Sequence, residues 1–261
     1  MPGGAHLLPA LDQAVHAAVV AGTTPEWRAT TADIDISDAA ITAGMAGWAV
    51  TSAYLLAAAP KRHALPLTLA WAFYLWGFGA VLTDPALVHS LKAAFHRLRP
   101  STLHHSFSFP SGHTTAASFI VGALVMVLLP LALQQAAQQQ EAQQQAAQQQ
   151  AAQQQAAQQQ PPQAPGGAQV GGVGGAASAL ARRCLPGWYG AAGGMWAAGV
   201  VATASGRVLA DAHWVSDTLA GACLGAAGVA ALSWLVSLAT EPVLQERTAP
   251  TPAAEEAELK L

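Results

Sequence analysis

The sequence predicts an all-α fold: a multi-span transmembrane helical bundle with its active site at one membrane face. Of the 261 residues, 52% are hydrophobic and only 10% are charged, whereas about 25% of a soluble domain is charged. Several apolar segments approach the roughly twenty residues that a helix needs to cross a bilayer. The remaining polar side chains collect at one set of segment ends, which places a polar site at the membrane surface.

The predicted membrane spans are five apolar segments, at residues 39–59, 64–83, 114–133, 188–204 and 217–239. The fourth is shorter than the others and rich in glycine and alanine, and small residues of this kind suit close helix packing within lipid. The alternative is a set of core helices in a large soluble protein. The length of the segments and their lack of charge disfavour it.

The chain divides into regions by composition. A low-complexity linker insertion, rich in Gln and Ala and then in Gly, separates two blocks of apolar sequence. Its few apolar side chains cannot offset the entropy of ordering it, although the Ala/Gln part could form a transient helix. A surface helix is expected at about 10–21. The predicted regions are an N-terminal amphipathic, interfacial segment (1–38), a transmembrane core (39–133 and 188–240), the linker (134–187) and a disordered tail (241–261).

If every segment crosses, residues 84–113 and 205–216 lie on the same side of the membrane. Three polar stretches fall there, "LKAAFHRLRP", "FPSGH" and "SGRVLADAHWVSD". Lysines and arginines are equally numerous on the two sides, so their distribution sets no orientation. The sequence therefore predicts a multi-pass integral membrane protein. It does not identify the membrane, and both the endoplasmic reticulum and a chloroplast-type envelope are compatible with it.

The three stretches supply the parts of an oxyanion pocket. Lys92, Arg99 and Arg207 are cations, and the arginine fork matches phosphate oxygens in pairs. Ser111 and Gly112 precede an apolar helix, whose unsatisfied N–H groups and dipole favour an anion. Phosphate is the predicted occupant.

Two histidines and an aspartate add the chemistry. His213 and Asp217 are four residues apart and share one face of a helical turn. The carboxylate would orient the imidazole as a nucleophile, while His113 would protonate a leaving alkoxide. The expected reaction is displacement at phosphorus through a phosphohistidine that water hydrolyses. No acidic cluster for Mg²⁺ is visible, so neither a metal nor another cofactor is expected.

Each feature alone has an ordinary structural explanation: interfacial cations, a helix cap or a surface i,i+4 pair. Together they would require three coincidences on one face. The net charge of −3 and the lack of a basic face with interleaved aromatic residues exclude a nucleic-acid partner. The expected partners are a lipid phosphate substrate and membrane lipids, and the oligomeric state stays open. Two cysteines make neither a disulfide framework nor a zinc site.

These motifs resemble the signature of the type 2 phosphatidic acid phosphatase and vanadium haloperoxidase superfamily. Lys92 is followed after six residues by Arg99-Pro100, Pro110 to His113 reads Pro-Ser-Gly-His, and Arg207, His213 and Asp217 have the family's spacing. The resemblance covers about residues 10–240 without the insertion. It implies that His213 is the nucleophile, Asp217 its partner and His113 the acid. Phosphate would be bound by Lys92, Arg99, Ser111, Gly112 and Arg207, without a metal.

The sequence departs from the family pattern in two places. Gly206 stands where the family has serine, and Ser205 comes one position early. Membrane members commonly have six spans, whereas five are counted here. The resemblance implies hydrolysis of phosphatidate or of a prenyl diphosphate. A lipid phosphotransferase and a catalytically weak membrane scaffold are the alternatives, and the predicted spans argue against a soluble haloperoxidase.

Overall fold

The computed structural model describes residues 7–33, 36–58, 87–101, 106–158 and 176–248. Every regular element in these ranges is helical, which confirms the all-α prediction. The elements are α1 (Leu7–Gly22), α2 (Pro25–Asp33), α3 (Ile36–Ala58), α5 (Leu87–Phe95), α6 (Gly112–Ala123), the π-helical turn η1 (Leu124–Leu128), α7 (Leu129–Gln158), α8 (Ala176–Leu209) and α9 (Val215–Thr248).

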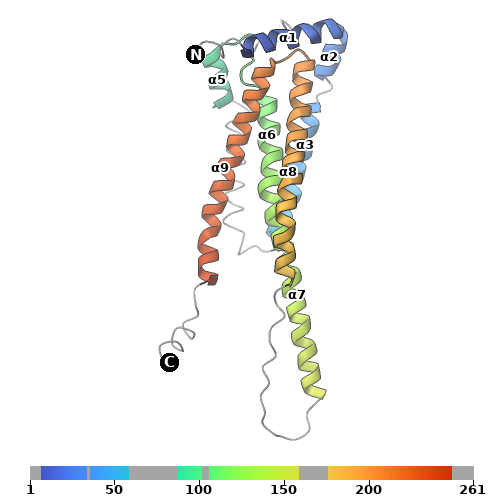
Figure 1. The fold of residues 1–261 in the computed structure, drawn as a ribbon, viewed down its shortest axis with the longest axis vertical. Coiled ribbons are helices and arrows are strands. Elements are labelled where there is room, and N and C mark those ends of the chain that lie inside the picture. Colours follow the sequence, from blue (N-terminus) through green and yellow to red (C-terminus); the bar gives the residue numbers. More distant parts are fainter. Residues whose placement is uncertain (1–6, 34–35, 59–86, 102–105, 159–175, 249–261) are drawn as a thin grey trace.

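The long helices α3, α6, α8 and α9 run side by side along the long axis of the molecule (Figure 1). Helices α1 and α2 lie across one end of this bundle, and α5 lies at the same end. The surface helix expected at 10–21 is confirmed as α1. Helix α6 starts and helix α8 finishes at that end, and α9 also starts there, so the three polar stretches share one end of the bundle.

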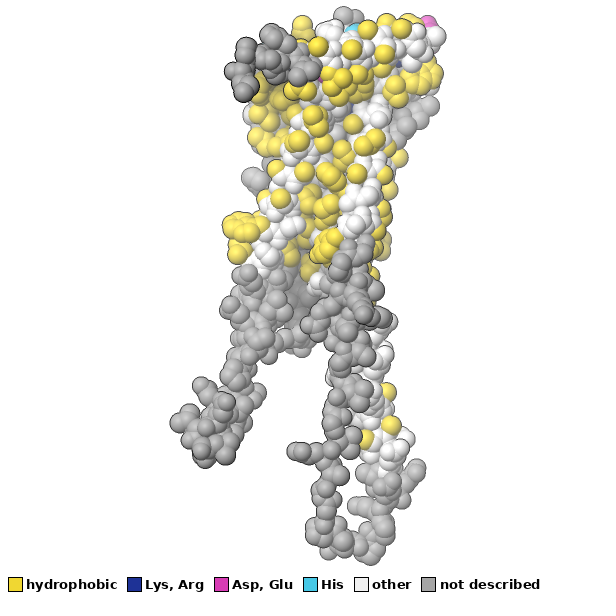
Figure 2. Space-filling model, viewed as in Figure 1, with side chains coloured by type: hydrophobic (Ala, Val, Ile, Leu, Met, Phe, Trp, Pro, Cys, Tyr) yellow, Lys and Arg dark blue, Asp and Glu magenta, His cyan; other side chains and the backbone are white. Residues whose placement is uncertain are grey.

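Three of the described helices are long and apolar enough to cross a membrane: Ala39–Ala57, Gly112–Gln155 and Val215–Leu238. They correspond to three of the five predicted spans and fit a membrane protein. The predicted span 64–83 lies outside the described residues. The predicted span 188–204 is helical within α8, but glycine, tyrosine and tryptophan lower its hydropathy, and α8 is not among the three. Apolar side chains cover the visible flank of the bundle (Figure 2).

The structure differs from the predicted linker and tail at their edges. Helix α7 continues through the Ala/Gln repeat to Gln158, with the repeat exposed all round from residue 142 to 155. Alanine and glutamine have high helix propensity, so the repeat extends a helix that has already been nucleated. Helix α8 begins at Ala176, inside the predicted linker, and α9 ends at Thr248, inside the predicted tail.

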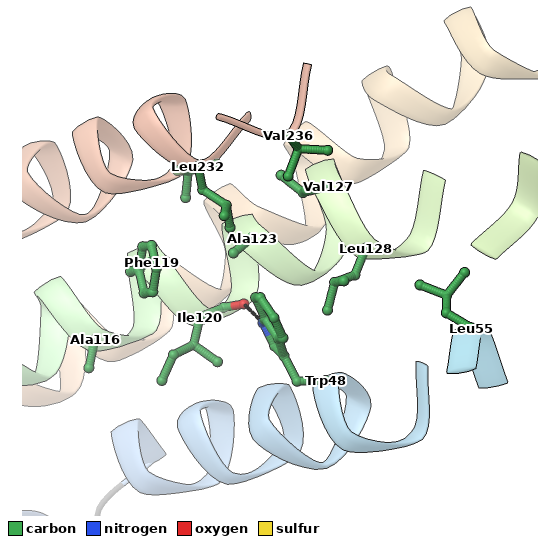
Figure 3. Close-up of a cluster of buried hydrophobic side chains, with 11 residues drawn as sticks. Trp48, Leu55, Ala116, Phe119, Ile120, Ala123, Val127, Leu128, Leu232 and Val236 are labelled. Carbon is green, nitrogen blue, oxygen red and sulfur yellow. Dashed lines mark hydrogen bonds between the residues drawn. The ribbon is translucent and has the colours of Figure 1, made fainter. Parts of the chain in front are cut away.

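The apolar core surrounds α6, which lies between α3 and α9. Ile120 and Ala123 of α6 are fully buried against Trp48 of α3 and Leu232 of α9 (Figure 3). The indole Nε1 of Trp48 donates a hydrogen bond to the Ile120 carbonyl at 3.1 Å. This bond satisfies the only polar atom of a buried tryptophan side chain, so α3 is fixed against α6 at that level.

Small residues let α9 approach α6 closely. A Cβ atom added at Gly221 would lie 2.5 Å from the Ser111 carbonyl oxygen, and one added at Gly225 would lie 2.6 Å from the Thr115 carbonyl oxygen. Neither backbone atom can move aside as a side chain would. The close approach also allows the Ser111 amide to donate to the Asp217 carbonyl oxygen at 3.0 Å. The glycines of α9 therefore join the second polar stretch to the third.

We expect Gly221→Ala to destabilise the protein by about 1–3 kcal/mol, because the added methyl group forces the two backbones apart. Thermal unfolding in detergent, followed by tryptophan fluorescence, measures the change. Gly193→Ala is the matched control, since a Cβ there meets nothing within 4 Å. Equal melting temperatures for the two variants would contradict the close-contact explanation.

Candidate active site

Helix α5 ends at Phe95 within the first polar stretch. The backbone that follows binds Ser108, the residue directly before the second stretch. The Ser108 amide donates to the Arg97 carbonyl oxygen at 2.8 Å, and the Ser108 hydroxyl contacts the carbonyls of Arg97 and Leu98 at 3.1 and 3.2 Å. The Trp214 Nε1 of the third stretch donates to the same Leu98 carbonyl at 2.8 Å. All three polar stretches therefore meet, as the topology predicts.

Arg99 has a central place among these stretches. Its Nε and Nη2 donate to the carbonyl and the hydroxyl of Ser106 at 3.0 and 2.9 Å. Its Nη1 donates to the Ala212 carbonyl at 2.9 Å and lies 3.2 Å from His213 Nε2. Because an arginine can only donate, His213 Nε2 accepts in this contact, and its proton resides on Nδ1.

A tight turn between α8 and α9 orients His213. The Arg207 carbonyl oxygen accepts from the amides of Ala212 and His213 at 3.1 and 3.3 Å. Asp211 within the turn has a φ of 56°, a left-handed conformation that aspartate tolerates better than most residues. Arg207 is itself 8% exposed. The turn therefore joins two buried residues, and the charge of Arg207 is close enough to act on the His213 imidazole.

His213 and Asp217 are both buried, and their side chains face each other. The His213 Nδ1 lies 3.6 Å from Asp217 Oδ2, an electrostatic contact longer than a hydrogen bond. The same Oδ2 accepts from the Trp214 amide at 3.0 Å. The predicted pair is thus brought together, with the proton-bearing nitrogen toward the carboxylate and Nε2 toward Arg99.

The cations at the site crowd one another. The pKa of Lys92 lies below its ordinary value, first because burial disfavours the ammonium and then because Arg99 and Arg207 are near. Burial, followed by the charge of Arg207, also lowers the pKa of Arg99. Mutual repulsion of this kind is relieved when an anion enters, so the arrangement favours an anion near these three cations.

Burial lowers the pKa of His213 to about 4, although its contact with Asp217 acts in the opposite direction. The imidazole is therefore neutral at neutral pH, with Nε2 carrying a lone pair. A nucleophilic histidine needs this protonation state.

This shift predicts a pH-dependent stability. Unfolded histidine has a pKa near 6.5, so between about pH 6.5 and the folded value the unfolded chain binds more protons. The free energy of unfolding should fall as the pH drops through that window, by about 3 kcal/mol for this group. Thermal unfolding at pH 7 and pH 4 measures it. In His213→Asn the decrease in the free energy of unfolding between pH 7 and pH 4 should be smaller by about 3 kcal/mol. A decrease equal to that of wild type would refute the lowered pKa of His213.

Helix α6 begins at the second stretch. Ser111 is its N-cap, fully buried, with the hydroxyl 3.5 Å from the Thr114 amide and 3.1 Å from the Thr114 hydroxyl. Its phosphate contact stays a prediction, since this hydroxyl caps the helix. A Cβ at Gly112 would be 3.9 Å from Val88, so packing does not require a glycine there. His113 lies in the first turn, half-buried. The positive end of the α6 dipole thus lies at the same end of the bundle as the three polar stretches.

The sequence comparison decides the family. The PAP2 superfamily model matches residues 73–241, which include all three polar stretches. The chain belongs to the PAP2 superfamily. This membership supports a phosphatase-type activity in general. No curated protein and no solved structure matches the chain.

Gly206, where the PAP2 pattern has serine, faces open space. A Cβ at this position meets nothing within 4 Å, whereas Ser205 is exposed and points elsewhere around the helix. The structure therefore gives Ser205 no route to replace the missing hydroxyl.

We expect Gly206→Ser to fold normally and to raise the rate of phosphate release several-fold, because the hydroxyl adds a donor beside Arg207. Colorimetric phosphate release measures this, with Gly206→Ala as the control for backbone effects. Equal rates in Gly206→Ser and wild type would show that the position tolerates glycine.

The structure also brings in residues that the sequence interpretation did not assign. Arg97 contacts Asp217, and Asp12 of α1 contacts Arg97 and Ser216. Arg97 lies two residues before the family arginine, and nothing in its spacing marks it. Asp12 is some 200 residues from Ser216 in the chain, so only tertiary packing reveals the contact. Three further histidines lie in or beside the first polar stretch: His96 is exposed, and His104 and His105 lie outside the described residues.

Proposed function

We propose that this PAP2 member is a metal-independent phosphatase that hydrolyses a lipid phosphate or diphosphate through a phosphohistidine. One observation carries the proposal: a neutral, buried His213 directs Nε2 at the guanidinium of Arg99, 3.2 Å away. The guanidinium marks where a bound phosphate would present its oxygens. The proposed nucleophile and the proposed phosphate ligand are thus in contact before substrate arrives.

In the first step, phosphate enters between Lys92, Arg99 and Arg207 near the start of α6. Arg99 then donates to phosphate oxygens, which frees His213 Nε2 to attack phosphorus. The Nε2–P bond forms as the bond from phosphorus to the alkoxide oxygen breaks. His113 gives its proton to the departing oxygen, and the lipid alcohol leaves; from a diphosphate, the bridging P–O bond breaks and the lipid monophosphate leaves instead. The cations stabilise the charge on the equatorial oxygens during the displacement.

The second step returns the enzyme to its starting state. The now neutral His113 takes a proton from water as the water oxygen attacks phosphorus, and the Nε2–P bond breaks. Inorganic phosphate is released. Asp217 holds the Nδ1 proton throughout and stabilises the positive imidazole of the intermediate. Phosphotransfer, the second candidate, would follow if another alcohol replaced water in this step.

A lipid substrate is supported by the position of the site. It lies at the end of a bundle whose helices are apolar on the outside, with Val50 71% and Trp234 62% exposed. The acyl or prenyl chain would remain in the bilayer while its phosphate reached the pocket. Phosphatidate and prenyl diphosphates both satisfy this geometry.

Phosphate release from the purified protein in detergent tests the proposal, with phosphatidate and farnesyl diphosphate offered separately. We expect release from at least one of them to continue at the same rate in EDTA. Release that EDTA abolishes would assign the chemistry to a metal. No release from either lipid would favour the scaffold alternative, while formation of a new phospholipid in the presence of a second alcohol would favour phosphotransfer.

A further inference from the structure

We propose that Asp12 and Arg97 are positioning residues that hold the Asp217 carboxylate against His213, so that the N-terminal helix α1 sets the geometry of the catalytic pair. The inference rests on the proposed function. It concerns neither the nucleophile nor the phosphate ligands of the PAP2 signature, and it gives α1 a role beyond covering one end of the bundle.

Arg97 joins the two carboxylates. Its Nη1 donates to Asp217 Oδ1 at 2.8 Å, and its Nη2 donates to Asp12 Oδ2 at 2.6 Å. The guanidinium carbon lies 5.5 Å from the centre of the Trp214 ring, which restrains its plane. A planar group held on three sides has little freedom to rotate, and it fixes the position of Asp217 Oδ1.

Asp12 secures the other end of this bridge. It is 3% exposed and lies on the inward face of α1. Its Oδ1 accepts from the Ser216 amide at 3.0 Å, and its Oδ2 is 2.6 Å from the Ser216 hydroxyl. A buried carboxylate is stable only with partners of this kind, and this one also meets the positive end of the α9 dipole. Asp12 thus fixes both Arg97 and the first turn of α9.

The catalytic pair needs this support because its own contact is weak. Asp217 Oδ2 is 3.6 Å from His213 Nδ1, and its other restraint is the Trp214 amide. With Oδ1 released, the carboxylate could rotate, and the imidazole would lose its orienting partner. Small displacements of a catalytic group lower the rate of the chemical step and leave substrate binding intact.

A second set of contacts shows that α1 packs against the turn between α8 and α9. His16 Nδ1 lies 2.9 Å from Asp211 Oδ1, and its ring packs edge-on to Trp214 with the centroids 5.4 Å apart. Asp12 and His16 are one helical turn apart, so one face of α1 contacts both ends of the segment that carries His213.

The test compares kcat and KM for the lipid phosphate that wild type hydrolyses, using Asp12→Asn, Arg97→Gln, Arg97→Lys and the double variant Asp12→Asn/Arg97→Gln. We expect kcat to fall about tenfold in each Asn or Gln single variant, with KM within about twofold of wild type. Arg97→Lys should recover part of the loss, because an ammonium reaches one carboxylate but not both. The double variant should lose clearly less than the product of the two single losses, because part of the effect of Asp12 passes through Arg97.

Arg28→Gln is the matched control: Arg28 belongs to the N-terminal segment and approaches an aspartate, Asp211 at 3.9 Å, without touching Asp217. Its kcat should match wild type, and melting temperatures identify any variant that has lost its fold. If the two single losses multiplied to about a hundredfold in the double variant, Asp12 and Arg97 would act independently and the proposed bridge would be wrong. A raised KM with unchanged kcat would make Arg97 a substrate ligand instead. Unchanged kinetics beside an inactive His213→Ala would refute this inference alone, whereas a wild type that hydrolyses no lipid phosphate would refute the proposed function and this inference together.

Discussion

Replacing His213 with alanine should lower phosphate release by about 10⁴-fold or more. On the proposed mechanism the variant loses the atom that attacks phosphorus, and Arg99, which contacts Nε2 in the structure, cannot act as a nucleophile. The lost side chain is buried, so a stability measurement must accompany the assay. Initial rates of phosphate release, in detergent with EDTA, measure the effect.

His89→Ala is the control histidine, because it lies on α5 at the same end of the bundle and is exposed. It should retain the wild-type rate. Rapid quenching in alkali after mixing with ³²P-labelled substrate should trap a labelled protein in wild type and none in His213→Ala. Activity that survives in folded His213→Ala would exclude the phosphohistidine route, and a label that persists would move the nucleophile to another residue.

The second large effect is expected for His113→Ala and depends on the leaving group. With a lipid phosphate the rate should fall about 10³-fold, because an alkoxide departs poorly without a proton. With p-nitrophenyl phosphate the first turnover should be nearly unaffected, because nitrophenolate is a far weaker base and needs no acid. Stopped-flow absorbance of the nitrophenolate burst measures this step separately from hydrolysis of the intermediate.

Arg99→Ala provides the contrast for that experiment. A phosphate ligand contributes to both substrates equally, so both rates should fall together. If His113→Ala also lowered the two rates by the same factor, His113 would be a phosphate ligand and not the acid. If it changed neither, the proton would come from another group.

The sequence alone determined the class of the fold. Low charge and long apolar segments predict membrane helices because unpaired backbone groups are too costly in lipid for other structures. The order of those segments also placed Lys92, Arg99, His113 and His213 at one end, since successive spans alternate sides. The spacing of His213 and Asp217 on one helical turn was likewise visible, and the structure shows their side chains facing each other.

Composition was a poorer guide to where helices end. The Ala/Gln repeat was predicted as a solvated linker that forms at most a transient helix, whereas α7 continues through it to Gln158. Helix propensity acts residue by residue and needs no buried face once a helix has been nucleated. A hydrophobicity pattern cannot detect that extension.

Only the tertiary structure decided how the His213–Asp217 pair is supported. The contact between α6 and α9 depends on Gly221 meeting the Ser111 backbone, and nothing local to Gly221 announces it. The bridge from Asp12 through Arg97 to Asp217 joins residues from three distant parts of the chain. Sequence patterns report periodicity within one helix, whereas the position of a charge between helices depends on how their faces pack. The sequence therefore determined which groups meet at one membrane face, and packing decided which atoms orient them.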